Sequence, residues 1–319
     1  MELGRMLDKC VRDQWSIDDL DWDVPPPTLP REKEEAVVQA FLDMSGIELL
    51  AGALFEVQRA KTTDPTLHKI FSTFVADEKR HSAVALRLSQ HYNVHRYREY
   101  VESPALTAFR PHFLTLVRQT SPEIANAYIT SGELMLDVAL LRSLDDYVND
   151  DMSHRAMHLV NRDESRHIAV DFHMVEYYCS DEYLAAAKQR PRQSLGAALH
   201  SVRSFATMMW HAKPFLEQVF LAPMDRTDPS GTRFKEAIKR IQLVLRKPTV
   251  ARTPFPRFMI TMQTLYNEPR LRLLQPLLLR VLGADKRAAA YNFTPEELER
   301  SQRMSFDEMA DEALAAKLS

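Results

Sequence analysis

Glycine is scarce in this chain, at only seven of 319 residues. A protein of average composition and this length has roughly 22. Glycine supplies the positive-φ positions of tight turns, hairpins and phosphate-binding loops. We therefore do not expect a β-barrel, a β-sandwich or a glycine-rich nucleotide-binding fold. Long helices exclude glycine from their interiors, so the sequence predicts an all-α protein.

Composition narrows the function classes further. The formal net charge is −3, which gives no electrostatic reason to expect nucleic-acid binding. Two cysteines, Cys10 and Cys179, cannot build a disulfide framework. The first 15 residues carry charges and lack an apolar core, so no signal peptide is expected. With no apolar run of about 18 residues, no transmembrane segment is expected either. These features favour a cytoplasmic protein.

Three regions are predicted along the chain. Residues 1–30 are interpreted as an extended arm that ends in prolines and is pinned to the body by Trp15, Leu20 and Trp22. Residues 31–180 are expected to form a four-helix bundle, and residues 181–319 a C-terminal helical extension packed on it. The predicted helices are 31–60, 66–92, 104–118, 121–149, 154–178, 182–190, 192–222, 232–246, 256–267, 269–282 and 295–316.

An internal repeat links the two long helix pairs. The first pair contains Glu48 followed by Asp-Glu-Lys-Arg-His, and the second contains Glu133 followed by Asp-Glu-Ser-Arg-His. Glu78 follows Glu48 by 30 residues, and Glu164 follows Glu133 by 31 residues. This separation suits two antiparallel helices with a short turn, which brings each single glutamate level with a Glu-x-x-His motif.

The repeat predicts a site for two metal ions. Residues three apart lie on one helix face, so each Glu-x-x-His motif can reach one site. Four carboxylates and two imidazoles suit two Fe ions, or Mn, with positions left for water or dioxygen. One such motif is common on solvated helix faces, whereas two matched copies are not. The predicted ligands are Glu48, Glu78, His81, Glu133, Glu164 and His167.

With these motifs, the sequence resembles the ferritin-like di-iron oxygenase superfamily over about residues 35–178. The paired Asp-Glu-x-Arg-His motifs are most similar to bacterial multicomponent monooxygenases, soluble acyl-carrier-protein desaturases and arylamine N-oxygenases. The resemblance implies a ferritin-like four-helix bundle. It also implies that Glu48 and His81 bind one iron, Glu133 and His167 the other, and that Glu78 and Glu164 bridge both.

The resemblance also assigns supporting residues. Asp77 and Asp163 match the family aspartates that orient the ligand histidines. Arg80 and Arg166 match the motif arginine and are interpreted as partners of buried carboxylates, with surface salt bridges as the alternative.

Three positions depart from the family patterns. Ala85 stands where ribonucleotide reductase has its radical tyrosine, and Val160 where N-oxygenases have an extra histidine ligand. Asp137 replaces a threonine of the monooxygenases; one turn from Glu133, it is the candidate catalytic acid for proton delivery. Asp171, one turn past His167, is interpreted as a supporting carboxylate or extra ligand. Either acid can instead be an ordinary hydrogen-bonding or exposed side chain.

Small residues in the first half indicate where a substrate can enter. Gly52 and Ala85 occupy the positions that correspond to Asp137 and Asp171, so the substrate pocket is predicted near Met44, Gly52, Phe55 and Ala85. Close helix packing is an equally good interpretation of Gly52.

Two outer segments suggest partners. Residues 231–257 hold eight Lys or Arg and one acid, which can dock an acidic ferredoxin or carrier protein or form a solvated face. The apolar stretch Leu271–Leu282 can touch a membrane surface, form a dimer interface or pack in the core. A homodimer is expected.

The predicted function is dioxygen-dependent oxidation of a small organic or acyl substrate by a di-iron enzyme. The reaction is hydroxylation, desaturation or N-oxygenation, and an external reductase or ferredoxin supplies electrons. One alternative is iron oxidation and storage, although ferritins lack the 140-residue extension. The other is a metal-free helical interaction protein.

Overall fold

The computed structural model describes residues 1–190 and 194–316, and all of its regular elements are helical. No strand occurs within these ranges. The all-α prediction is therefore confirmed. The predicted start of a helix at residue 192 lies outside the described residues.

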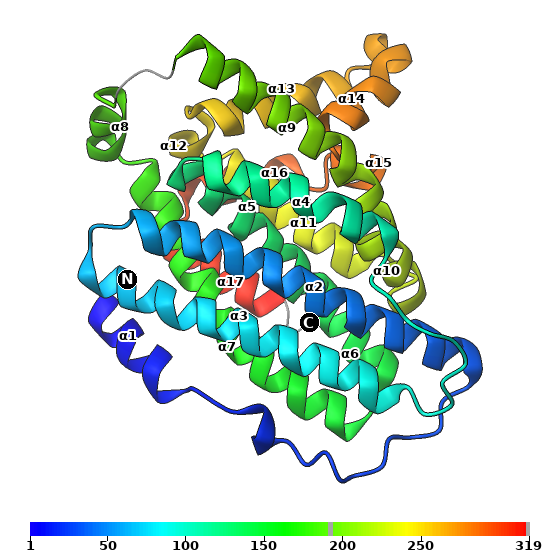
Figure 1. Ribbon diagram of the computed structural model, residues 1–319. Helices are drawn as coiled ribbons and strands as arrows, with labels where there is room; N and C mark the ends of the chain where they lie inside the picture. The colour runs from blue at the N-terminus through cyan, green and yellow to red at the C-terminus, as the bar shows by residue number, and fades with distance from the viewer. Residues whose placement is uncertain (191–193, 317–319) are drawn as a thin grey trace.

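Two antiparallel helices form the first layer. α2 (Arg31–Lys61) and α3 (Pro65–Tyr92) lie side by side along most of their length (Figure 1). Asp64 fixes the turn between them because its carboxylate accepts hydrogen bonds from the backbone N–H groups of Thr66 and Leu67, at 2.7 and 2.9 Å. Pro65 then occupies the first turn of α3, where a missing N–H costs nothing.

A second pair packs against the first. Its first member runs without a break through α5 (Pro122–Met135), the π-helical segment η2 (Leu136–Leu141) and α6 (Arg142–Val148). Its second member is α7 (Asp151–Tyr178). Asn149 closes α6 in the left-handed conformation with φ of 52°, and Asp150 caps α7 through the N–H of Met152. The crossover between the pairs carries α4 (Pro104–Gln119), which packs on α2.

The predicted arm contains a helix. α1 (Leu3–Arg12) packs on α3 and α7, and a short 3₁₀ turn, η1 (Ile17–Asp19), follows it. The prediction of an extended segment is wrong here, because the prolines at 25–30 lie too far along the chain to prevent a helix at residue 3. Trp15 and Leu20 are buried and Trp22 is partly buried, as the pinning interpretation requires.

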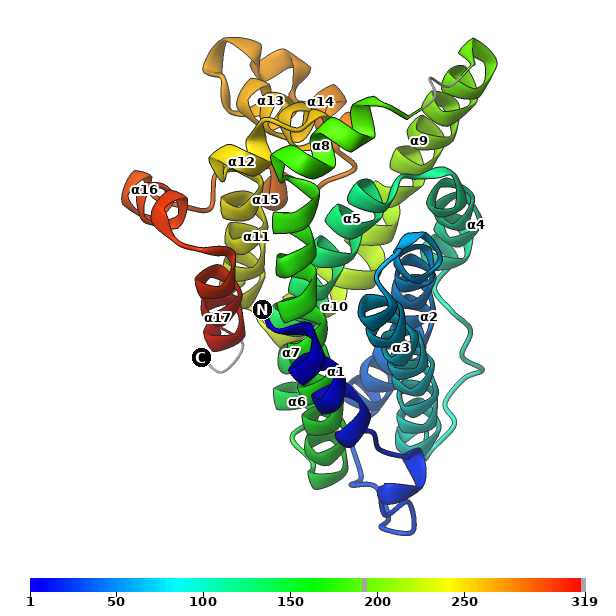
Figure 2. The ribbon, with the colours of Figure 1, turned by 90° about the vertical axis from the view of Figure 1, so that its left-hand side faces the viewer.

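Much of the C-terminal region packs on the second pair on the side away from α2 and α3, whereas α9 packs on α4 (Figure 2). α11 packs on α5 and η2, and α17 packs on α7. The helices of this region are α8 (Asp181–Lys188), α9 (Leu195–Phe215), the π segment η3 (Leu216–Leu221), α10 (Ala222–Thr227), α11 (Thr232–Leu245), α12 (Pro248–Ala251), α13 (Pro254–Asn267), the 3₁₀ helix η4 (Pro269–Leu274), α14 (Gln275–Leu282), α15 (Lys286–Ala289), α16 (Pro295–Arg303) and α17 (Phe306–Ala316).

Two stretches, Arg31–Lys61 and Pro122–Val148, are long and apolar enough to cross a membrane by length and composition alone. In the most apolar windows of these helices, 56% and 72% of the residues are buried inside the protein. Core helices of soluble proteins share these properties, and both stretches carry a buried glutamate of the predicted site. The location of the protein stays a prediction.

Candidate metal centre

The six predicted ligands meet between α2, α3, α5 and α7. Each has a relative exposure of 1% or less. One group of potential ligand atoms, all within 4.8 Å of one another, comes from Glu48, Glu78, His81 and Glu164. A second such group comes from Glu78, Glu133, Glu164 and His167. Glu78 and Glu164 belong to both groups, which is the arrangement expected of two bridging carboxylates.

Several polar atoms of this cluster lack hydrogen-bond partners. Both carboxylate oxygens of Glu48, Glu78 and Glu133 are buried without one, as are Glu164 Oε1 and His81 Nδ1. Leaving a buried polar atom unpaired costs about 1–3 kcal/mol, and more when the group is charged. Four carboxylates carry a charge of −4 when ionised, which two divalent cations would balance. The donor set therefore fits a pair of metal ions.

Burial and mutual contact shift the pKa values of these groups. Burial, together with the neighbouring carboxylates, raises the pKa of Glu48, Glu78 and Glu133. Burial also opposes ionisation of Glu164, but the charge of His167 and the close approach of Glu133 and both histidines lower its pKa well below its ordinary value. Without metals, Glu164 is the anionic centre of the cluster.

Both histidines point one ring nitrogen at the glutamates. His81 Nδ1 lies 3.0 Å from Glu164 Oε1, and His167 Nδ1 lies 3.1 Å from Glu78 Oε1 and 3.0 Å from Glu164 Oε2. Burial lowers the pKa of each imidazole, yet the adjacent carboxylates outweigh burial and raise it well above its ordinary value.

The other ring nitrogen of each histidine contacts the aspartate of the opposite motif. His81 Nε2 lies 3.1 Å from Asp163 Oδ2, and His167 Nε2 lies 3.4 Å from Asp77 Oδ2. A neutral imidazole that donates its Nε2–H to an aspartate keeps the Nδ1 lone pair free to bind a metal. The two motifs therefore support each other across the α3–α7 interface.

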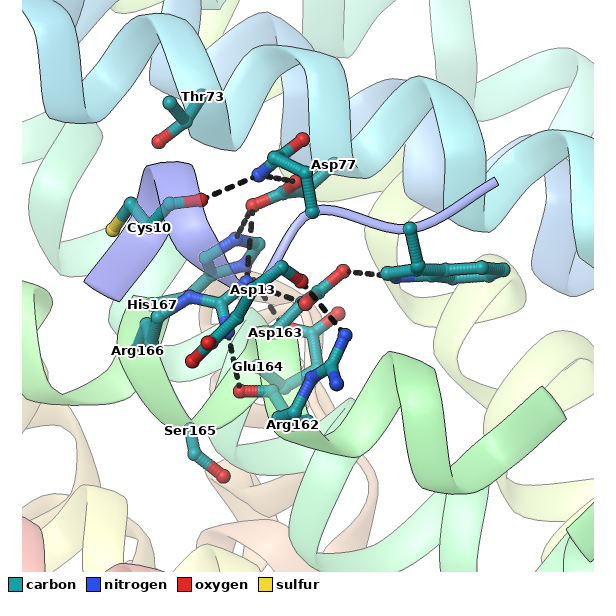
Figure 3. A network of polar contacts seen from close by, with 12 residues as sticks. Cys10, Asp13, Thr73, Asp77, Arg162, Asp163, Glu164, Ser165, Arg166 and His167 are labelled. Atoms are coloured by element: carbon teal, nitrogen blue, oxygen red, sulfur yellow. Dashed lines mark hydrogen bonds and ion pairs between the residues drawn. The ribbon is translucent and has the colours of Figure 1, made fainter. Parts of the chain in front are cut away.

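Arginines and the N-terminal segment complete this network (Figure 3). Arg166 is fully buried and forms an ion pair with Asp163. Its Nη2 atom also lies 3.8 Å from Asp77 Oδ2. Arg80 pairs with both aspartates and is only 13% exposed. Both arginines thus contact buried carboxylates, as interpreted from the motif, and neither is a surface salt bridge.

Trp15 is a site residue that the sequence analysis missed. Its indole Nε1 donates to Asp163 Oδ2 at 2.7 Å, and its ring stacks on His81 with centroids 6.5 Å apart. Gln14 also bridges Arg80 and Asp77. Trp15 lies three residues after the end of α1, and its sequence position indicates an anchor but not this contact with Asp163.

Two further acids lie beside the cluster. Asp137 is fully buried in the π-helical segment η2, two residues after the end of α5. A π-helical turn within a helix often marks a functional site. Asp171 is also fully buried, and both of its oxygens lack partners. Burial, with added repulsion from Glu164 and Glu78, raises its pKa well above its ordinary value.

The predicted substrate pocket coincides with tight packing. Met44, Phe55 and Ala85 are fully buried, and a Cβ on Gly52 would lie 3.2 Å from Glu78 Cβ. Gly52 thus lets α3 approach α2, as its packing interpretation requires. Phe55 packs edge-on against His167, with ring centroids 5.0 Å apart. A cavity of about 750 Å³ lies elsewhere, along α5, so entry near Gly52 stays a prediction.

The basic segment is mostly committed to contacts within the chain. Arg233, Lys239, Arg240 and Arg252 form ion pairs with acids outside the segment or within it. Lys247 is buried, and its Nζ donates a hydrogen bond to the backbone oxygen of Met304. These contacts weaken its interpretation as a docking surface.

The apolar stretch Leu271–Leu282 is split between core and surface. Leu278 and Leu282 are buried, whereas Leu273 and Leu277 are 96% and 62% exposed. The core-packing interpretation holds for one face only, and the exposed leucines leave the membrane and dimer interpretations as predictions.

Comparison with known proteins adds no assignment. No protein-family model matches the chain, and no curated protein matches it. The assignment of this site therefore depends on its own geometry and on the resemblance of its motifs.

Proposed function

We propose that the protein is a di-iron enzyme that uses dioxygen to oxidise a small organic or acyl substrate. We further propose that α2, α3, α5–α6 and α7 form a ferritin-like bundle around the two ions. The observation that carries the proposal is the pair of buried four-residue ligand groups that share Glu78 and Glu164. When bound, two ferrous ions supply the electrons and Lewis acidity needed to activate dioxygen.

The protein's own residues would prepare this chemistry by orienting the histidines, by excluding water and by supplying protons. Asp163 and Asp77 hold His81 and His167 so that each Nδ1 faces the carboxylates. Aromatic rings shield the centre from water, since Phe74 and Phe55 lie against His167 at centroid distances of 4.1 and 5.0 Å.

Proton supply would fall to the buried acids. Burial raises the pKa of Asp171, which favours the protonated carboxyl that a proton donor needs. Asp137, which is equally buried, remains the other candidate for this role.

Metal analysis tests the proposal first. Protein produced with ample iron should contain about two Fe per chain, and Glu78→Ala and Glu164→Ala should each abolish binding of both ions because each residue belongs to both groups. Glu48→Ala should weaken only one site. Protein that holds no transition metal under these conditions would refute both the enzyme and the storage functions.

Reactivity and size then separate the oxidising enzyme from a storage protein. Anaerobically reduced protein is mixed with dioxygen, and the resulting absorbance change is followed with fatty acyl, arylamine and amino-acid candidates. A substrate that accelerates decay of the signal identifies the reaction class. A large hollow assembly that accumulates iron beyond two ions per chain would favour storage instead.

A further inference from the structure

Helix α9 presents an exposed apolar face. Its N-terminal part lies with α13 and α14 at the end of the molecule opposite the turn between α6 and α7 (Figures 1 and 2). The side chains of this face recur every three or four residues, which places them on one side of the helix: Leu195, Leu199, Val202, Ala206 and Trp210. All five are exposed, and the four large ones have relative exposures of 92%, 72%, 64% and 55%.

The apolar face continues onto η4 and α14. Leu273, Leu274 and Leu277 are 96%, 47% and 62% exposed. Arg280, one turn after Leu277, lies over the ring of Trp210, 3.5 Å from its centroid, and so joins the two helices. We call these exposed side chains of α9, η4 and α14 the α9–α14 face. Single exposed leucines are ordinary, whereas a gathered set of them marks an interaction surface.

Positive charge surrounds the α9–α14 face. The whole chain has 41 Lys or Arg against 44 acids, yet α9 and residues 254–282 together hold six bases and one acid, Glu268. Five of the bases are exposed and form no ion pair with any described residue: Arg203, Arg257, Arg270, Arg272 and Arg280. The sixth, Lys213, pairs with Glu217. Helix α4, which packs along α9, contributes no acid. The exposed leucines thus lie among arginines whose charge the chain does not balance.

This charge decides what can cover the face. A two-fold dimer built through it would bring the face against its own copy, so the unpaired arginines of the two copies would oppose one another. An anionic membrane surface instead offers phosphate groups to the arginines and an apolar layer to the leucines. Leucine and tryptophan on one side of a helix, with arginine beside them, are typical of segments that lie at a membrane interface.

We propose that the α9–α14 face binds the surface of a membrane that contains anionic phospholipids. The exposed leucines and Trp210 insert at the boundary between headgroups and acyl chains, and the arginines contact lipid phosphates. The binding is peripheral, since neither α9 nor α14 is among the helices long and apolar enough to cross a membrane. It does not depend on the metal centre, so its test leaves the proposed function untouched.

Co-sedimentation of the full chain with vesicles tests the proposal. Vesicles of phosphatidylcholine alone are compared with vesicles that also contain about 30% phosphatidylglycerol. One arginine near an anionic surface contributes about fivefold to binding, so three engaged arginines give the anionic vesicles about a hundredfold advantage. Raising NaCl from about 0.05 to about 0.5 M should remove most of this advantage. No binding to either vesicle, or equal binding to both, would overturn the proposal.

A double leucine variant tests the apolar contribution. Leu199→Ser combined with Leu277→Ser changes two exposed side chains and leaves the core intact. Binding to anionic vesicles should weaken at least about tenfold, because less apolar surface leaves water. Val101→Ser, a 67% exposed position before α4, is the matched control and should bind as the natural protein does. Unchanged binding in the leucine variant would overturn the proposal.

A double arginine variant tests the charge contribution. Arg203→Gln combined with Arg272→Gln should lower affinity for anionic vesicles about 25-fold and leave affinity for neutral vesicles unchanged. Arg155→Gln removes an exposed arginine of α7 that also lacks an acidic partner among the described residues, and it should have little effect on either. An equal loss in Arg155→Gln and in the double variant would show that the α9–α14 face is not the site.

Tryptophan fluorescence then locates the inserted surface. Trp210 is exposed, whereas Trp15 is buried and Trp22 partly buried. Anionic vesicles with brominated acyl chains should quench the emission of the natural protein, and Trp210→Phe should abolish this quenching. Quenching that persists in Trp210→Phe would overturn the location. Sedimentation equilibrium without vesicles tests the other occupant: a dimer that the two leucine substitutions dissociate would assign the face to a second copy and overturn membrane binding.

Discussion

Loading the centre with metal should expel several protons. Metal ligands must be deprotonated, whereas burial raises the pKa of three glutamates of the metal-free cluster, Glu48, Glu78 and Glu133, and so favours their protonated forms. The pKa values of both histidines are also raised, which favours their protonated forms and makes them the other possible source of protons. Glu164 has a lowered pKa and adds none. The three glutamates and two histidines together give an upper bound of about five protons for two ions.

The sign and steepness of the pH dependence follow. Because each raised pKa favours the protonated, metal-free form, the affinity of the cluster for metal ions should rise with pH. The product of the two binding constants changes by about tenfold per pH unit for each proton released, hence by about 10³ to 10⁵ for three to five protons.

Isothermal titration with Mn²⁺ in buffers of different ionisation enthalpy measures the protons directly. Glu48→Gln should weaken binding and release fewer protons. Glu123→Gln, which changes a carboxylate bound to Tyr183 and away from the cluster, is the matched control and should leave both quantities unchanged. Release of fewer than about one proton per two ions would refute the account, because the glutamates would then be ionised before binding or would not be the ligands.

Four substitutions test the surroundings of the centre. Trp15→Phe removes the indole donor and should cost about 1.5–3 kcal/mol in urea unfolding, and a loss below about 0.5 kcal/mol would contradict its role. Arg166→Met leaves buried carboxylates unpaired and should cost about 3–5 kcal/mol in the same assay; a neutral result would show that the pairing is dispensable. Gly132→Ala, with open space around its Cβ, should stabilise the protein by up to about 1 kcal/mol. Gly52→Ala should instead displace Glu78 and weaken metal binding, and equal metal affinities in the two variants would contradict this contact.

The clustering of the six candidate ligands could be predicted because its geometry is local. Three-residue spacing on one helix puts Glu78 beside His81, and a capped turn of three residues fixes how α3 folds back on α2. The pairing of Asp77 with His167 depends on the rotation of α3 against α7. That rotation is set by side-chain packing over the whole interface, so the spacing of the motif residues along the sequence could not predict it.

The predicted helix boundaries are wrong at two places, one with a local sequence signal and one without. The predicted helix 295–316 is two helices, and Ser305 caps the second by accepting the N–H of Glu308, a Ser-x-x-Glu pattern that was readable in the sequence. The π segment within 121–149 had no such signal, because an extra residue in a helix is accommodated by packing.

The network around Asp163 changes how the N-terminal region is understood. Its carboxylate receives contacts from Trp15 in the N-terminal segment, Arg80 and His81 on α3, and Arg166 on α7. A buried carboxylate with this many donors has its pKa held far below the ordinary range, and its hydrogen bond with His81 in turn helps to raise the pKa of that imidazole. Trp15 of the predicted arm therefore belongs to one hydrogen-bonded unit with α3 and α7. Residues 1–30 act as part of the support of a ligand histidine, because the orientation of His81 and the position of Trp15 depend on the same oxygen atom.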